Sequence, residues 1–272
     1  RWYKNRVVVN YDMDSKDPSD AEPKAPNDGN RCMLTMCYVT SGRFLLGRSW
    51  RQLSQEQLHD LSRIFPYPDS EKSARPIDAF DAGVKFPRIY DFEVDSDWHQ
   101  LTFYNYNMDS SKVQHNIISV SLNKSLNEGG LQLDSLKQYY VYDFWNDHFI
   151  GLIKGNDNLK QQLRAGEARM MSLHAKENHP QFISTNRHIM QGYVDLKNVI
   201  WNEKNKTFSG EAAVVADDSY TIVIATNGYK FNTVKINSGN VVISKIDEEN
   251  GLIYLTIHSH QNKEIKWSVG FR

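Results

Sequence analysis

The sequence predicts a mainly β protein in which two antiparallel β-sandwich domains follow a short α/β segment. From about residue 70 onward, apolar and polar residues alternate in short runs separated by polar turns, as is typical of antiparallel strands. Before about residue 65, two apolar runs alternate with two stretches of helical period, which indicates a parallel strand–helix–strand–helix unit. We therefore expect three regions, at residues 1–68, 69–176 and 177–272.

The first region is expected to alternate strands and helices. Residues 6–11 (RVVVNY) form a β-branched run, as expected for a parallel strand buried on both faces. After a polar loop with three prolines, residues 31–42 (RCMLTMCYVTSG) predict a buried helix that ends at Gly42. Residues 43–47 (RFLLG) predict a second short strand. Two parallel strands need neighbouring strands and covering helices, so we expect that this segment cannot fold alone.

The clearest local signal in this region is LSQEQL. Ser54 is expected to cap a helix while the Gln57 side chain reaches back to it, and Leu53 is expected to pack against Leu58. Apolar residues then recur at helical spacing until two prolines end the helix: Leu58, Leu61 and Ile64, then Pro66 and Pro68.

The other two regions are built from runs of period two. In the middle region these runs are residues 98–107, 115–123, 138–146, 148–155 and 168–175. In the last region they are residues 198–214, 219–231, 240–247, 251–260 and 265–272. The turns NEKNK (202–206) and DEENG (247–251) predict hairpin tips.

Composition and motifs exclude several classes of function. The chain has 32 basic and 33 acidic residues without a basic stripe, so nucleic acid is not an expected partner. No apolar run approaches the roughly 20 residues that span a bilayer, and a membrane is not expected either. A signal-peptide pattern is absent, and the location stays open, with a secreted or periplasmic enzyme as one option.

No cofactor or metal is expected, because no phosphate-binding glycine loop, GxSxG, HExxH or CxxC is present. Cys32 and Cys37 are predicted to be buried thiols. His258 and His260 share a strand face but lack further ligands, so we expect them on the solvent face.

Pairs of aspartates are of interest because two carboxylates at a suitable separation suffice for glycoside hydrolysis. Most of the pairs lie in turns or at strand ends, where aspartate commonly binds backbone N–H groups: Asp78 and Asp81, Asp95 and Asp97, Asp143 and Asp147. Only Asp12 and Asp14 directly follow a predicted parallel strand, the edge at which a barrel carries its active site. A functional role and a loop-capping role both stay open for them.

Residues 139–151 (YYVYDFWNDHFIG) combine many aromatic and polar side chains that could contact a sugar. Alternation places Tyr140, Tyr142 and Phe144 on one face of a strand. Because aromatic side chains on strands usually serve packing, we interpret this stretch as core rather than as a sugar platform.

Several stretches, taken in order, resemble the melibiase-like glycoside hydrolases, the α-galactosidase relatives of families 27 and 36. Residues 139–151 and 168–175 resemble the closing strands of the C-terminal β-sandwich of these enzymes. Three other parts of these enzymes are similar to stretches of this chain. Residues 73–92 and 98–107 resemble the lead into the sandwich, and residues 31–66 resemble the last barrel units. Residues 179–196 resemble the segment that leaves the sandwich in bacterial members.

The resemblance implies that no catalytic residue lies in this chain. The catalytic aspartates of the family lie on the fourth and sixth barrel strands, whereas this chain begins at what resembles the seventh. A whole barrel takes about 250 residues, far more than the first region holds. We therefore expect the catalytic pair upstream of this chain.

The resemblance also implies substrate-binding residues. Asp12 and Asp14 match part of the family's Asn-Asp-Pro-Asp motif after the seventh strand, while Tyr11 and Met13 depart from it. After the eighth strand, where the family has an acidic residue, this chain carries Arg48 and Trp50. An arginine there favours an anionic or differently shaped sugar.

The leading hypothesis is the C-terminal part of a retaining glycoside hydrolase that acts on O-glycosidic bonds and is inactive as this chain alone. Its partners would be a carbohydrate and the N-terminal catalytic portion of the same enzyme. The alternative is a non-catalytic carbohydrate-binding or structural β-sandwich protein. The two differ in whether Trp145, Trp201 and Trp267 are buried or form an exposed row.

Overall fold

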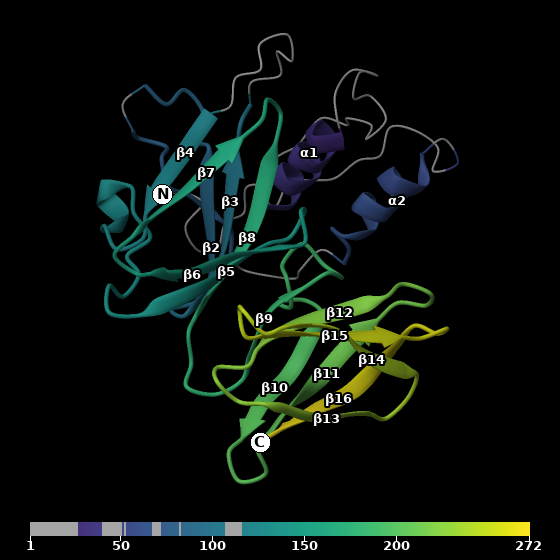
Figure 1. The fold of residues 1–272 in the computed structure, drawn as a ribbon. Coiled ribbons are helices and arrows are strands. Elements are labelled where there is room, and N and C mark those ends of the chain that lie inside the picture. Colours follow the sequence, from purple (N-terminus) through teal and green to yellow (C-terminus); the bar gives the residue numbers. More distant parts are fainter. Residues whose placement is uncertain (1–26, 40–50, 52, 67–71, 82, 107–115) are drawn as a thin grey trace. The chain divides into compact units, whose positions relative to one another are not determined.

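The computed structural model describes residues 27–39, 51, 53–66, 72–81, 83–106 and 116–272 (Figure 1). The chain divides into two compact units. The first unit is Arg1–Tyr139 with Ile153–Leu173, and the second is Tyr140–Leu152 with His174–Arg272. The predicted strands at residues 6–11 and 43–47 lie outside the described residues. The parallel pair and the barrel units therefore stay predictions.

Two α-helices are described in the first unit, α1 (Asn27–Val39) and α2 (Gln55–Ser62). The sequence predicted the first helix but placed its start too late, at Arg31. Asn27 and Asp28 had been assigned to the polar loop, although short polar residues favour the first turn of a helix. Cys32 and Cys37 on α1 are buried and form no disulfide, which confirms the prediction of buried thiols.

The start of α2 confirms the predicted capping box. The Gln57 amide donates to Ser54 Oγ at 3.1 Å, and the Ser54 amide donates to Gln57 Oε1 at 2.9 Å. The helix ends at Ser62, and Arg63 forms its C-cap.

Replacing Ser54 by alanine should lower the free energy of unfolding of the first unit by about 1 kcal/mol, because the Gln57 amide loses its acceptor. Urea unfolding measured by circular dichroism tests this value. Gln55→Ala changes an exposed side chain in the same turn and serves as the control, with a change expected to stay within about 0.5 kcal/mol. Equal effects of the two substitutions would contradict the capping role.

All other described elements except one short 3-10 helix are strands. The first set is β1 (Arg75–Pro76), β2 (Ile89–Asp95), β3 (Trp98–Tyr104), β4 (Asn116–Ser121), β5 (Gln138–Asp143), β6 (His148–Lys154), β7 (Asn158–Leu163) and β8 (Ala168–Ala175). The second set is β9 (Gln181–Thr185), β10 (Leu196–Asn202), β11 (Thr207–Val214), β12 (Tyr220–Ala225), β13 (Phe231–Ile236), β14 (Asn240–Asp247), β15 (Leu252–His258) and β16 (Lys263–Phe271).

The strands form antiparallel sheets, so the predicted fold class is confirmed. Their orders are β1-β2-β3-β8-β5-β6, β10-β11-β16-β13, β14-β15-β12-β9 and β4-β7. Every run of period two that was predicted contains a strand, and both predicted hairpin tips join paired strands, with Asn202 opposite Thr207 and Asp247 opposite Leu252.

Sequence reasoning missed β1, β2, β7 and β9, and it missed β13 apart from its first residue, Phe231. In β7 the inward positions are Leu159, Gln161 and Leu163, which alternate with exposed residues. The central inward residue, Gln161, is polar and accepts a hydrogen bond from Arg169. The sequence of β7 therefore does not show the alternation of apolar and polar residues by which the other strands were predicted.

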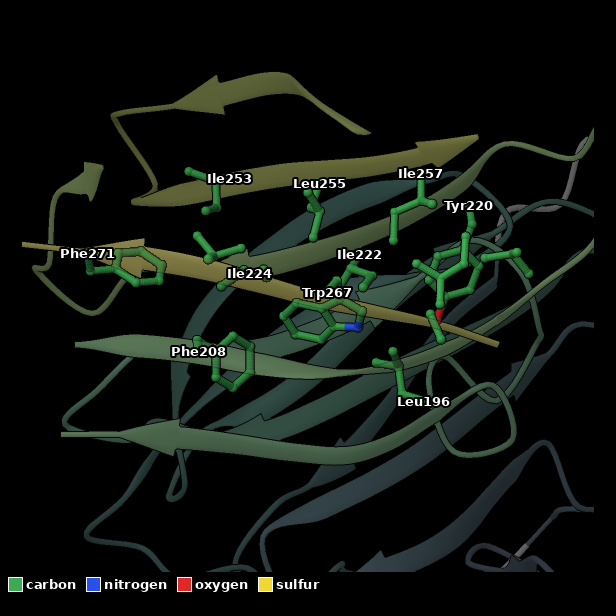
Figure 2. Packing of buried hydrophobic residues seen from close by; sticks show 14 residues of the cluster. Leu196, Phe208, Tyr220, Ile222, Ile224, Ile253, Leu255, Ile257, Trp267 and Phe271 are labelled. Carbon is green, nitrogen blue, oxygen red and sulfur yellow. The ribbon is translucent and has the colours of Figure 1, made fainter. Parts of the chain in front are cut away.

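The second unit has a core between two four-stranded sheets, which Figure 2 shows from close by. Trp267 of β16 is 2% exposed and lies edge-on to Phe208 of β11, with ring centroids 5.4 Å apart. Gly210 faces the same indole, because a Cβ built there would lie 2.8 Å from Trp267 Cζ2. The close packing of this tryptophan thus depends on a residue without a side chain.

The first half of the stretch at residues 139–151 is core, as predicted: residues 139–144 are buried, whereas residues 145–151 are half-buried or exposed. Tyr140 and Tyr142 are buried against Val223 and Tyr254, which lie on β12 and β15. The Tyr140 hydroxyl donates to Asn227 Oδ1, and the Tyr142 hydroxyl donates to Asp147 Oδ1, both at 2.7 Å. Their polar ends are therefore satisfied within the second unit.

Of the helices in the described ranges, none has the length and apolar character needed to cross a membrane.

Candidate functional site

The four residues predicted to bind substrate are Asp12, Asp14, Arg48 and Trp50. All four lie outside the described residues, and their placement stays a prediction. The description below concerns the polar and aromatic groups of the described ranges.

In two of the aspartate pairs, one member binds backbone amides. The buried Asp78 carboxylate accepts bonds from the amides of Arg88 and Ile89 at 2.8 and 3.1 Å, and from Arg88 Nε at 3.1 Å. Asp95 Oδ1 accepts the Asp97 amide at 2.8 Å. For Asp78 and Asp95 this confirms the prediction that aspartates in turns and at strand ends bind backbone N–H groups.

The third pair belongs to the turn between β5 and β6. Asn146 Nδ2 donates to Asp143 Oδ2, and Tyr142 donates to Asp147 Oδ1, each at 2.7 Å. Asp147 has a φ of 45°, a left-handed conformation that aspartate tolerates better than most residues. This pair therefore shapes the hairpin.

A buried charge cluster joins β1, β2 and β3. Arg75 Nη2 donates to Asp91 Oδ2 at 2.9 Å, and His99 Nδ1 lies 3.0 Å from Asp91 Oδ1. An aspartate that orients a histidine is one half of a general-base arrangement. The His99 ring is only 3% exposed, however, so this cluster serves to hold the three strands together.

The pKa of His99 is raised in the folded protein. Burial acts to lower it, but the hydrogen bond and charge of Asp91, followed by the charge of Glu93, more than offset burial. Protonated His99 therefore stabilises the fold. This contribution is fully present below the pKa of an unfolded histidine, about 6.5, and is lost as pH rises through the raised pKa of the folded state.

We expect the free energy of unfolding of the first unit to fall as pH rises from about 6 to 8, and His99→Gln to flatten this dependence. Urea unfolding at several pH values gives the slope, and an NMR titration of His99 gives its pKa. His260→Gln is the control, because the His260 side chain is 93% exposed. An unchanged slope in His99→Gln would contradict the assignment.

A second buried carboxylate, Asp195, organises the connection between β9 and β10. Thr185 Oγ1 donates to its Oδ2 at 2.9 Å, and the Gly192 amide donates to its Oδ1 at 3.2 Å. Burial raises the pKa of Asp195 despite these bonds. A shifted carboxyl pKa can mark a reactive group, but Asp195 is buried and is bound by Thr185 and Gly192, which favours a structural role. Sequence reasoning gave no signal for this residue.

A group of aromatic and charged side chains suited to a sugar lies at one end of the second unit. We call it the aromatic end cluster; its residues are His179, Trp201, Glu203, Lys206, Tyr229 and Phe271. They meet because Asn202 pairs with Thr207, Thr207 with Gly270, and Phe231 with Phe271. The ends of β10 and β16 and the starts of β11 and β13 therefore lie together.

The half-buried Trp201 ring is the centre of this cluster. His179 stacks on it at 5.7 Å with planes 10° apart, and Tyr229 meets it edge-on at 5.1 Å. Its Nε1 donates to Glu203 Oε2 at 2.7 Å. The Lys206 ammonium binds Glu203 and lies 5.2 Å from the centre of the Tyr229 ring. Aromatic faces with charged groups at their edges are a composition suited to sugar binding.

The three tryptophans that separate the two hypotheses do not form an exposed row. Trp267 is buried, whereas Trp145 and Trp201 are half-buried. His258 and His260 are both exposed, as predicted, and bind Ser219 and Asp217. Within the described ranges, no three His, Cys, Asp or Glu side chains converge in the manner of metal ligands.

Comparison with known proteins gives matches only at the level of structure. No family model matches the chain, and no curated protein matches its sequence. A family 27 β-L-arabinopyranosidase from Geobacillus stearothermophilus is similar over 55% of this chain and 31% of its own, at 15% identity and a TM-score of 0.40. α-Galactosidase I from Mortierella vinacea is similar over 62% and 40%, at 12% identity and a TM-score of 0.45.

An isomalto-dextranase from Arthrobacter globiformis, solved with panose, is similar over 91% of this chain and 45% of its own, at 10% identity and a TM-score of 0.40. The chain thus spans between about a third and a half of the length of these enzymes. The neighbours are glycoside hydrolases, and they include enzymes of the α-galactosidase class that the sequence resembles.

Proposed function

We propose that this chain is the C-terminal portion of a retaining, metal-independent glycoside hydrolase that acts on O-glycosidic bonds. One observation carries this proposal: the stretches that resemble the family's sandwich lie together in the fold. Residues 73–92, 98–107, 139–151 and 168–175 supply β1, β2, β3, β5, β6 and β8. These are the strands of the six-stranded sheet, so patterns that are scattered along the sequence belong to one structural element.

The catalytic pair is proposed to lie upstream of this chain. A retaining enzyme needs two carboxyl groups about 5–5.5 Å apart, on either side of the scissile bond. Four of the aspartates weighed for this role bind backbone amides or other side chains of the chain itself: Asp78, Asp95, Asp143 and Asp147. This supports the proposal that the two catalytic carboxyl groups lie in a segment upstream of this chain.

Residues 1–68 are proposed to be the last units of a (β/α)8 barrel, followed by β domains at 69–176 and 177–272. In such a barrel Asp12 and Asp14 would follow the seventh strand, and Arg48 and Trp50 the eighth, at the edge where barrels bind substrate. Arg48 would then favour a sugar with a carboxylate, because its guanidinium binds carboxylates in a bidentate manner.

Covalent labelling of the enzyme that includes the upstream segment tests this proposal. A retaining enzyme forms a glycosyl-enzyme intermediate, which a slowly hydrolysed fluorinated galactosyl donor traps. Peptide mapping by mass spectrometry should place the label on an aspartate upstream of Arg1. A label on any carboxylate of residues 1–272 would contradict the proposal.

The alternative, a non-catalytic carbohydrate-binding or structural protein, predicts an exposed row of tryptophans. The enzyme portion predicts three buried tryptophans instead. Trp267 is buried, whereas Trp145 and Trp201 are half-buried, so the tryptophans favour neither function. The gathering of the family-like stretches in the six-stranded sheet supports the enzyme portion.

A further inference from the structure

We propose that the aromatic end cluster binds one galactose-type pyranose ring, which stacks on Tyr229 beside Trp201. The choice of sugar rests on the proposed function, whereas the site itself rests on the geometry of the cluster.

The two rings form a corner that fits one sugar. Tyr229 and Trp201 meet at an interplanar angle of 70°, with centroids 5.1 Å apart. A galactopyranose has one face of C–H groups and a rim of hydroxyls. Its C–H face can cover one aromatic ring while its rim reaches the groups around the second ring.

The rim groups of the cluster are charged and accessible. The side chains of Glu203 and Lys206 are 67% and 40% exposed. Their mutual bond lowers the pKa of Glu203 and raises that of Lys206, so both stay charged at neutral pH. A carboxylate that accepts and an ammonium that donates can together bind neighbouring sugar hydroxyls.

Lys206 covers the Tyr229 ring, and a bound sugar can displace its side chain. The ammonium lies over one face of the ring, 5.2 Å from the ring centre. Its ion pair with Glu203 is exposed to solvent, and exposed ion pairs contribute little to stability. Displacing the lysine side chain by a sugar therefore costs little.

The remaining groups hold the cluster in place before a ligand binds. His179 stacks on Trp201, and Asn227 Nδ2 donates to the His179 carbonyl at 2.7 Å and to Gln181 Oε1 at 3.0 Å. Phe271, which is buried, packs edge-on against Trp201. A site that is rigid in advance loses less entropy on binding.

The test is a titration of the ¹⁵N-labelled chain with raffinose, whose terminal unit is galactose, followed by NMR of the six tryptophan indole groups. The Trp201 resonance, assigned from the spectrum of Trp201→Phe, should shift and saturate. The Trp267 resonance should not move, because this residue is buried in the same unit. The inference is overturned if the Trp201 resonance does not move at up to roughly 50 mM raffinose, well above a millimolar dissociation constant.

Two variants test the stacking itself. Tyr229→Leu removes the ring and should weaken binding roughly fivefold, whereas Phe80→Ala, which truncates a ring that is 94% exposed in the first unit, should leave binding unchanged. Lys206→Ala uncovers the Tyr229 ring with little risk to folding and should change the dissociation constant at least about twofold. Unaltered affinity in a folded Tyr229→Leu, or in Lys206→Ala, would also overturn the inference.

Failure here can be told apart from failure of the proposed function. The titration measures binding by a chain that is proposed to be inactive, whereas the labelling experiment locates chemistry on the upstream segment. An enzyme labelled upstream whose C-terminal chain does not bind raffinose would refute only this inference.

Discussion

Replacing Trp267 by alanine should lower the free energy of unfolding of the second unit by about 3–5 kcal/mol. The indole is buried between the two four-stranded sheets, among side chains of β11, β12 and β15 (Figure 2). The sheets cannot collapse onto the space that alanine leaves without breaking their strand pairing. Urea unfolding followed by circular dichroism measures the loss, and a loss below about 1 kcal/mol would contradict the central position of this residue.

Trp267→Phe is the matched variant. The indole Nε1 has no hydrogen-bond partner among the described residues. The substitution by phenylalanine therefore removes side-chain volume from the core but no hydrogen bond. Its cost should be clearly smaller than that of alanine.

Gly210→Ala probes the same contact from the opposite side, because its methyl group would lie 2.8 Å from Trp267 Cζ2. We expect it to cost about 1–3 kcal/mol, and less in the Trp267→Phe background because the clashing atoms are gone.

Replacing Asp91 by alanine should have an effect of similar size in the first unit. The substitution leaves Arg75 and His99 without their shared carboxylate, and removing one partner of a buried ion pair costs about 3–5 kcal/mol. We expect the lower end of this range, because a quarter of the Arg75 side chain is exposed and water can solvate part of its charge.

Asp97→Ala is the control for this substitution. Asp97 binds Lys137 at 2.6 Å, but both side chains are largely exposed, so its loss should cost less than about 1 kcal/mol. Urea unfolding of both variants at neutral pH makes the comparison. Equal costs for Asp91 and Asp97 would show that burial does not distinguish the two pairs.

The features that were predicted correctly depend on residues close together in sequence. The capping box needs only Ser54 and Gln57, and the hairpin at residues 202–206 needs only its turn and two alternating strands. Burial of residues 139–143 followed from aromatic and β-branched side chains in an alternating run.

The features that were missed depend on register or on sheet order. Asp91 meets His99 because β2 pairs with β3 through a bulge near Glu93, and the sequence carries no signal for that register. Trp201, Tyr229 and Phe271 meet only because β16 lies between β11 and β13. The order of strands in a sheet follows from long-range packing, which local patterns do not encode.

The central claim is that this chain belongs to a glycoside hydrolase whose catalytic pair lies upstream. The most direct test compares the isolated chain with the same chain extended by its upstream segment, using 4-nitrophenyl α-galactoside, β-L-arabinopyranoside and galacturonide. The account predicts release of nitrophenol from at least one substrate by the extended protein and none by the chain alone. Turnover by the isolated 272 residues, or a folded extended protein that hydrolyses none of the three, would contradict it.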